Sequence, residues 1–189
     1  YYQELDMRRG LVTRVARYQD LHGRRTKVTI RQFQSLAGVH LAAMEAKVEA
    51  ENWSGNISVR SMIDGRVANR NVSADRELAG NHLEPVDSRE IDGQTVLLET
   101  QTNQSKVQIA VATRTTVNTS SHPMRRPVME GDLVAGHDIS LSLEAGVPVK
   151  IEKIAAASNS HDPAISTVWH NAVKRVQRAT GFRQMLTYH

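Results

Sequence analysis

The sequence predicts a mainly β protein: an antiparallel β-sandwich followed by a C-terminal helix. Short alternating segments follow one another between turn residues, with no helical pattern between them. The clearest runs from Asn56 to Asp64, where apolar and polar side chains alternate. Beyond Asp162, apolar residues recur at helical spacing instead. A length of 189 residues and a 40% hydrophobic content fit one domain with a sizeable core.

Two strands joined by a hairpin are predicted near the start of the chain. Residues 4–9 already alternate between apolar and polar side chains, and strands are expected over 11–18 and 25–36. The turn between them falls at 20–23, where Gly23 supplies the positive φ that a tight turn needs.

A β-bulge is predicted in the second of these strands. Val28 and Ile30 share a parity that Phe33 breaks, so we expect one extra residue near Arg31 or Gln32.

The segment from Leu41 to Ala50 is ambiguous between helix and strand. Its Ala, Glu and Met content favours a helix, but apolar and polar residues alternate along it. We predict a strand that leads through a turn at 52–55 into the strand that follows. The Asp64-Gly65 dipeptide favours a hairpin with positive φ angles, from which residues 67–73 should pair back.

The remaining segments continue this pattern and then end in a helix. Asp162 is a suitable N-cap and Pro163 a suitable first residue for a helix that ends at Gly181. The apolar residues after Gly181 are expected to be exposed. The other predictions are a polar loop at 74–92, strands at 94–100, 106–117, 137–143 and 149–156, and a loop or loosely held strand at 120–136.

Composition excludes several function classes. No cysteine is present, which excludes disulfides, thiol nucleophiles and thiolate metal sites and indicates a reducing compartment, so the expected location is cytoplasmic. No apolar run approaches the roughly 20 residues that span a bilayer, so no membrane partner is expected. The net charge of +4 comes from scattered basic residues without interleaved aromatics, so no nucleic-acid partner is expected either.

No catalytic constellation is visible in the sequence. The eight histidines lack the close spacing of a metal-binding face, and neither a serine-hydrolase elbow nor a phosphate-binding glycine loop occurs, so no catalytic, cofactor-binding or metal residues are predicted. Trp53 is the one candidate for contact with a sugar or an interface, although a core or turn tryptophan is the more common case. Some carboxylates could pair across a cleft, although structural or solvated roles are more common: Asp6, Asp64, Glu84, Asp87 and Glu99.

Three segments together resemble the N-terminal domain of glycoside hydrolase family 65, which contains maltose, trehalose and kojibiose phosphorylases and acid trehalases. They keep their order and spacing over roughly the first two thirds of the chain, and Gln104-Ser105 fits the same pattern. The segments are Glu4-Leu5-Asp6-Met7-Arg8-Arg9-Gly10-Leu11, Phe33-Gln34-Ser35-Leu36-Ala37 with His40-Leu41, and Asn52-Trp53-Ser54-Gly55 continuing through Ser61 to Val67.

The resemblance implies a sandwich of the galactose-mutarotase-like kind, a super-sandwich, over residues 1–158. Residues 159–189 would then be a linker helix leading toward an (α/α)6 catalytic barrel that lies outside this sequence. The family's catalytic glutamate and phosphate site lie in that barrel, so the resemblance assigns no catalytic residue here. It implies no cofactor, inorganic phosphate as co-substrate in a phosphorylase, an α-linked glucose disaccharide as substrate and a homodimer at full length.

Two functions from different classes remain open. The chain could be the non-catalytic sandwich of an enzyme that phosphorolyses or hydrolyses α-glucosidic disaccharides with inversion, supporting the active-site mouth and oligomerisation. Alternatively, it could be an independent carbohydrate-binding module. Such a module would need several exposed aromatics on one face, and aromatic residues make up only 4% of this sequence, which favours the supporting domain.

Overall fold

The computed structural model describes residues 1–68, 81–119, 122–162 and 167–189. These residues form eleven β-strands, two α-helices and one 3-10 turn. In chain order they are β1 (Tyr2–Asp6), β2 (Leu11–Gln19), β3 (Arg25–Gln34), β4 (Leu41–Ala50), β5 (Gly55–Asp64), β6 (Leu83–Asp92), β7 (Thr95–Thr102), β8 (Gln108–Asn118), β9 (Met124–Met129), η2 (Gly131–Leu133), β10 (Val134–Leu143), β11 (Val149–Asn159), α1 (Val168–Arg178) and α2 (Phe182–Tyr188).

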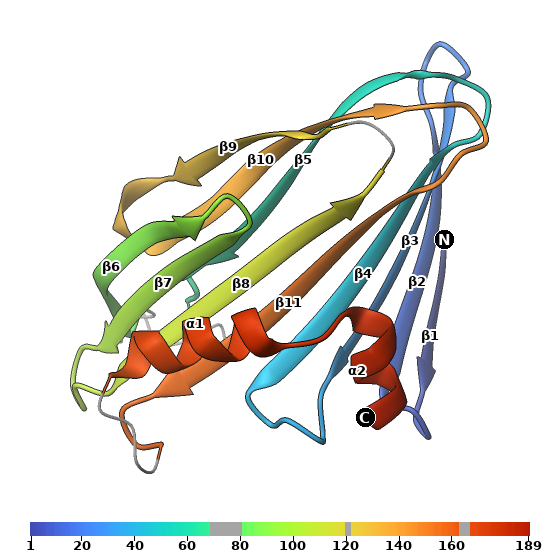
Figure 1. Cartoon of the computed structure of the whole chain (residues 1–189). Helices are drawn as coiled ribbons and strands as arrows, with labels where there is room; N and C mark the ends of the chain where they lie inside the picture. Colours follow the sequence, from blue (N-terminus) through green and yellow to red (C-terminus); the bar gives the residue numbers. More distant parts are fainter. Residues whose placement is uncertain (69–80, 120–121, 163–166) are drawn as a thin grey trace, which may run out of the picture.

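The strands form two antiparallel sheets that pack face to face (Figure 1). The larger has eight strands in the order β1-β2-β3-β4-β11-β8-β7-β6, and the smaller has three in the order β5-β10-β9. The chain passes from the larger sheet to the smaller between β4 and β5 and between β8 and β9, and it returns between β5 and β6 and between β10 and β11. The predicted mainly β antiparallel sandwich with a C-terminal helix is confirmed.

The main core lies between the two sheets. Ile57 and Val59 on β5 pack into a cluster that joins Val48 of β4, Ile139 of β10 and Ile151 of β11. The alternation predicted for β5 therefore has its expected cause: one side of the strand faces the larger sheet and the other faces away from it.

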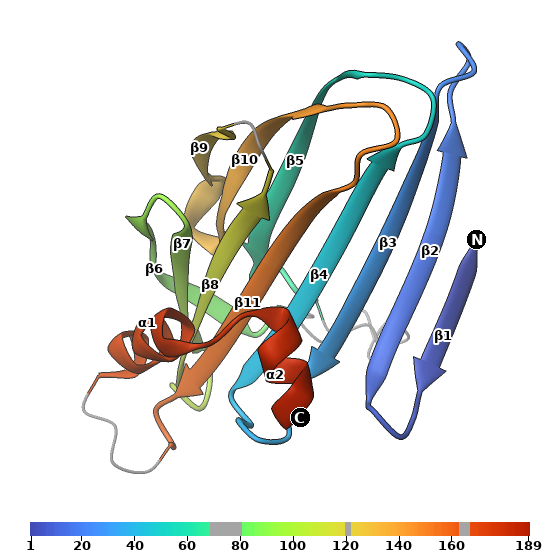
Figure 2. The same ribbon diagram turned by 45° about the vertical axis from the view of Figure 1, so that its right-hand side comes forward.

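Both helices lie across the other face of the larger sheet (Figure 2). The small side chains of Ala110 and Ala112 on β8 lie under α1 and let its Val173 and Val176 approach the sheet closely. In α2, the Phe182 ring packs edge-on against Phe33, with ring centroids 5.2 Å apart. The central strands of the larger sheet are therefore covered on both faces, by the smaller sheet and by helices, whereas the edge strand β1 is exposed.

Two of the local predictions are confirmed. β2 and β3 form a hairpin, and Gly23 has a φ of +75° in the turn. Residues 41–50 are a strand, paired with β3 on one side and β11 on the other. Pairing on both sides outweighs the helical propensity of this segment.

The predicted bulge near Arg31 or Gln32 is wrong. β3 keeps a continuous register with both β2 and β4. Val28 faces the smaller sheet, whereas Phe33 faces α2 on the other side. Apolar residues of both parities are explained by a strand that is buried on both faces.

The predicted hairpin at Asp64-Gly65 is also wrong. The partner of β5 is β10, some 70 residues further along the chain, and the Gly65 N–H donates to the Leu133 carbonyl at 2.8 Å. Gly65 is not among the glycines with positive φ. Most of the predicted returning strand, 67–73, lies outside the described residues.

The polar loop predicted for 74–92 contains an edge strand. β6 pairs with β7 over Leu83–Asp92, with register shifts after Pro85 and after Glu90. Each shift breaks the period of two by which strands are recognised, and a proline is tolerated only where no further strand pairs. Residues 74–80 lie outside the described residues. Of the two alternatives for 120–136, the strand is present: β9 pairs with β10.

The helical segment also differs from the prediction. α1 begins at Val168 with Thr167 as N-cap, whereas Asp162 accepts the Asn159 N–H and closes a turn. Pro163 lies outside the described residues. After Gly181 a second helix begins, and its Phe182 is buried against the sheet, contrary to the exposure that we expected.

Candidate functional site

Trp53 lies in the turn between β4 and β5, at one end of the sandwich. Its Nε1 donates to the Arg25 carbonyl and to Thr26 Oγ1, both at 3.1 Å. The ring packs against the cluster between the sheets, and the Arg24 guanidinium lies 5.4 Å from the ring centroid. The indole is half-buried, and its polar edge is occupied by the β2–β3 hairpin. Its contact with a sugar or an interface stays a prediction.

The residues around Trp53 tie three turns together. The Asn52 side chain accepts the Arg25 N–H at 2.7 Å and donates to the Gly23 carbonyl at 3.0 Å. Ser54 Oγ accepts the Ala145 N–H at 3.0 Å, from the turn between β10 and β11. This segment therefore fastens the ends of both sheets, a structural task that accounts for its polar residues.

Three of the five candidate carboxylates have local partners. Asp64 binds the Arg66 guanidinium, which lowers the pKa of that carboxyl to about 2. Glu84 forms an ion pair with Lys106 at 2.9 Å. Asp6 accepts main-chain N–H groups in the turn that follows β1. None of these three is brought near another of the five candidates by strand pairing.

The other two candidates, Asp87 and Glu99, lie opposite each other on β6 and β7. Glu99 is buried, and burial raises the pKa of its carboxyl; the charge of Asp87 raises this pKa further, whereas Arg89 lowers it. Asp87 forms an ion pair with Arg89, whose guanidinium lies 4.5 Å from the ring centroid of Trp169.

This acid pair lies on the helix-covered face of the larger sheet. Glu99 has the same parity on β7 as Leu97, which packs in the cluster under α1. Neither acid lines any of five hollows on the described surface. A glycosidase needs its two carboxyl groups on either side of a bound glycosidic bond, and none of these hollows places the two acids in that way.

His137 forms a second polar contact inside the sandwich. It is 1% exposed, and its Nε2 lies 2.9 Å from Glu90 Oε1, so the pair joins β10 to β6 across the gap between the sheets. Nearby, Ser61 Oγ and Thr115 Oγ1 lie 2.8 Å apart across the same gap. Both contacts pair polar groups that would otherwise be buried alone.

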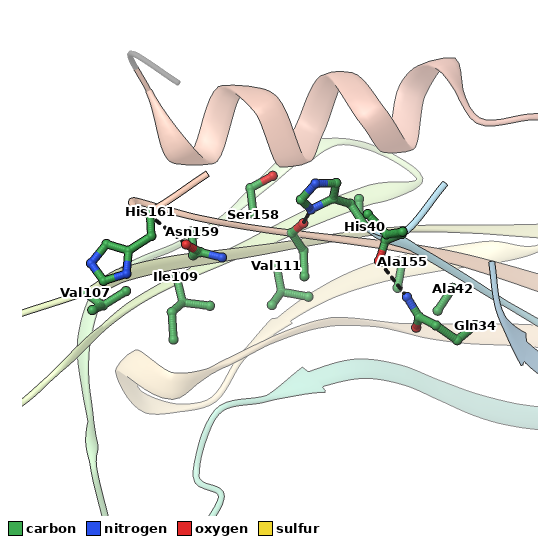
Figure 3. A pocket seen from close by; sticks show the side chains of 13 residues that line it. Gln34, His40, Ala42, Val107, Ile109, Val111, Ala155, Ser158, Asn159 and His161 are labelled. Carbon is green, nitrogen blue, oxygen red and sulfur yellow. Dashed lines mark hydrogen bonds between the residues drawn. The ribbon is translucent and has the colours of Figure 1, made fainter. Parts of the chain in front are cut away.

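A hollow of about 470 Å³ lies on the inner face of the larger sheet (Figure 3). Val107, Ile109 and Val111 supply apolar side chains that point away from α1. His40 lies at the rim, where its Nδ1 is 3.0 Å from the Ala157 carbonyl. The lining contains His40 and His161 but no carboxylate, so the hollow lacks the pair of carboxyl groups that glycosidic-bond cleavage requires.

A second hollow adjoins the first and shares Gln34, Ala42 and Ala155 with it. Lys153 lines this hollow, and its Nζ donates to the Met62 carbonyl on β5 at 2.7 Å. Burial lowers the pKa of the Lys153 ammonium group to about 8. No sequence pattern indicated this lysine, because its burial depends on where β5 crosses β11.

Among the described residues, no group of three or more His, Asp or Glu side chains could hold a metal ion. In the same part of the chain, no helix has the length and apolar content to cross a membrane.

The fold and these sites define a β-sandwich domain whose polar clusters tie strands and helices together. Comparison with known proteins identifies it more closely. The model of the N-terminal domain of glycosyl hydrolase family 65 matches residues 1–189. The chain belongs to this family, as the resemblance of its three segments indicated.

The relatives include proteins with named activities. An uncharacterised glycosyl hydrolase of Mycobacterium tuberculosis is 35% identical over 195 residues, covering 100% of this chain and 14% of its own. The kojibiose phosphorylase of Thermoanaerobacter brockii is 31% identical over 106 residues, covering 56% of this chain and 13% of its own. The α,α-trehalose phosphorylase of the same organism is 36% identical over 81 residues, covering 43% and 10%.

A solved structure has the same fold. It is a provisionally assigned kojibiose phosphorylase from the human microbiome, with a TM-score of 0.82 and 15% sequence identity, and the match covers 98% of this chain and 23% of that one. The chain thus spans 10–14% of the length of these curated relatives.

Proposed function

We propose that this chain is the non-catalytic N-terminal domain of an enzyme that cleaves α-glucosidic disaccharides of the maltose, trehalose or kojibiose type. One observation carries the proposal: the family model matches the chain throughout, whereas the chain spans only 10–14% of its relatives' length. The residues that break the glycosidic bond then lie in the remainder of the protein, and the isolated domain is inactive. The boundary between sandwich and linker near residue 158 is part of the same proposal.

The reaction of the whole protein follows from inverting glycoside chemistry. A carboxylic acid donates its proton to the glycosidic oxygen while the C1–O bond breaks, and a nucleophile forms a new bond to C1 from the opposite face. In phosphorolysis the nucleophile is phosphate, which is already an anion and needs no general base. In hydrolysis a second carboxylate must activate water. The relatives named as phosphorylases favour phosphate as co-substrate.

The role of the sandwich is to support the catalytic part and the assembly of subunits. α1 and α2 lie over the outer face of the larger sheet, so the C-terminal end of the chain is fixed against the domain and not free. A following domain would therefore start from a defined position beside the sheet. Homodimer formation and a cytoplasmic location are proposed with it.

Product analysis tests the reaction class. The longer protein is incubated with kojibiose, trehalose and maltose, with and without phosphate, and the products are identified by NMR. Inversion at an α-linked carbon predicts a β-configured glucose 1-phosphate that forms only when phosphate is present. Free β-glucose in both conditions would identify a hydrolase instead, and products of α configuration would contradict the proposed mechanism.

Titration of the 189-residue chain with the same disaccharides separates the supporting domain from a carbohydrate-binding module. The supporting domain predicts no saturable heat of binding in calorimetry. Saturable binding that is lost in Trp53→Ala would contradict it and would assign Trp53 to a sugar site.

A further inference from the structure

A hollow of about 580 Å³ lies at one end of the larger sheet. It is bounded by the turn between β6 and β7 and by the C-terminal end of α1, and Arg125 of β9 reaches it from the smaller sheet. Gly93 in the turn leaves room there, because a Cβ atom at this residue would meet nothing within 4 Å.

Arg125 has a charge that no described residue compensates. Its guanidinium forms neither a hydrogen bond nor an ion pair with the described residues, and its Nη1 is buried. Burial lowers the pKa of Arg125, and no carboxylate opposes that effect. The neighbouring Arg126 differs, because it reaches Asp138 Oδ2 at 3.4 Å. Arg125 is only half-buried as a residue, but a guanidinium nitrogen that is shielded from water and has no partner is costly, so it indicates a missing partner.

Thr95 lines the same hollow and carries a second unpaired group. It is 1% exposed, and its hydroxyl has no partner among the described residues. Buried hydroxyl groups are nearly always hydrogen-bonded, and this one can donate to an acceptor inside the hollow.

The other charged residues of the lining are already fixed. Arg114 donates to the Gln177 carbonyl at 3.2 Å and to the Ala179 carbonyl at 2.8 Å, which holds it at the end of α1. Asp92 Oδ1 accepts the Gln94 N–H at 2.9 Å and closes the turn. Two guanidinium groups against one carboxylate leave the lining with a net positive charge.

We propose that this hollow binds a small inorganic oxyanion of the phosphate or sulfate type, held by the Arg125 guanidinium and the Thr95 hydroxyl. The planar fork of an arginine matches two oxygens of such an ion, and a hydroxyl can donate to a third. Arg114 contributes charge from a fixed position. The ion would join β9 of the smaller sheet to β7 of the larger one, in addition to the His137–Glu90 and Ser61–Thr115 contacts that already join the sheets.

Calorimetric titration of the 189-residue chain with inorganic phosphate, in a buffer free of other oxyanions, tests the proposal. The wild-type chain should bind with a stoichiometry of one. Arg125→Gln should weaken binding at least tenfold, and Thr95→Val should weaken it several-fold. Arg126→Gln is the matched control, because it removes a neighbouring charge outside the hollow, and it should change the affinity less than twofold.

Thermal unfolding shows whether each variant still folds. Without phosphate, Arg125→Met should melt at or above the wild-type temperature, since a half-buried charge without a partner has been removed. With phosphate, the wild-type chain and Arg126→Gln should gain stability, whereas Arg125→Met should not. Absence of phosphate binding to the wild-type chain would overturn the proposal, as would equal binding by the Arg125 and Arg126 variants. If an acidic side chain from the remainder of the protein occupies this hollow instead of an ion, the wild-type chain should not bind phosphate.

Discussion

Lys153 should make the stability of this domain depend on pH in the alkaline range. Its ammonium group is buried where β5 crosses β11, and its pKa falls from 10.5 to about 8. Between these values the unfolded chain binds a proton that the folded chain does not. The free energy of unfolding therefore rises with pH in this window, by about 1.4 kcal/mol for each pH unit.

The size of the effect follows from the width of this window. A pKa shift from 10.5 to about 8 corresponds to about 3 kcal/mol between the two ends. Lys153→Met removes the titrating group but keeps a long side chain in the hollow. The loss of the bond to the Met62 carbonyl adds a constant cost, which does not vary with pH and so leaves the slope unaffected.

Urea unfolding of the wild type and Lys153→Met at several pH values from 7 to 11 measures this difference. Stability of the wild type relative to the variant should increase by about 3 kcal/mol over the series. Lys150→Met is the matched control for removal of a lysine, because Lys150 lies on the same strand with its ammonium group 3.5 Å from Glu45. Stability curves of wild type and Lys153→Met that stay parallel throughout would refute the reasoning.

Two further predictions test the packing of the sandwich and of the C-terminal helix. Gly136→Ala places a Cβ 2.5 Å from the Ser61 carbonyl oxygen on the neighbouring strand, so it should reduce the free energy of unfolding by about 3 kcal/mol in urea titration. Gly93→Ala is the control and should be neutral, because a Cβ atom there meets nothing within 4 Å. Equal effects of the two variants would contradict the close approach of β5 and β10. Phe182→Ala should lower the free energy of unfolding by about 4 kcal/mol, because this residue is 1% exposed between α2 and the sheet. Tyr188→Ala is the control and should lower it by under about 0.5 kcal/mol, because Tyr188 is 69% exposed. A Phe182 variant as stable as the Tyr188 variant would show that α2 is not packed against the sheet.

The sequence predicted those parts of the fold that depend on near neighbours. Alternation in residues 41–50 identified β4, and Gly23 marked a hairpin whose two strands adjoin it in sequence. The hairpin predicted at the Asp64-Gly65 dipeptide was wrong because the partner of β5 is β10, a distant strand that no local signal can indicate. β6 was missed because two register shifts break its alternation.

The sites were less accessible to sequence reasoning than the fold. Asp87 and Glu99 were both recognisable as candidates, but their meeting depends on the register of β6 against β7. Lys153 and Arg125 gave no sequence signal, because a lysine or an arginine becomes notable only when the surrounding elements remove water from it. Trp53 was correctly placed in the turn before β5, and its polar edge holds the β2–β3 hairpin; its contact with a sugar or an interface stays a prediction.

The central claim is that these residues supply a scaffold and that cleavage of the sugar depends on the rest of the protein. The most direct test is the rate of disaccharide cleavage by the purified 189-residue chain, measured beside the longer protein with kojibiose, trehalose and maltose in the presence of phosphate. We expect turnover by the longer protein and none above background by the chain alone. Cleavage by the isolated chain at a rate comparable to the longer protein would contradict the claim.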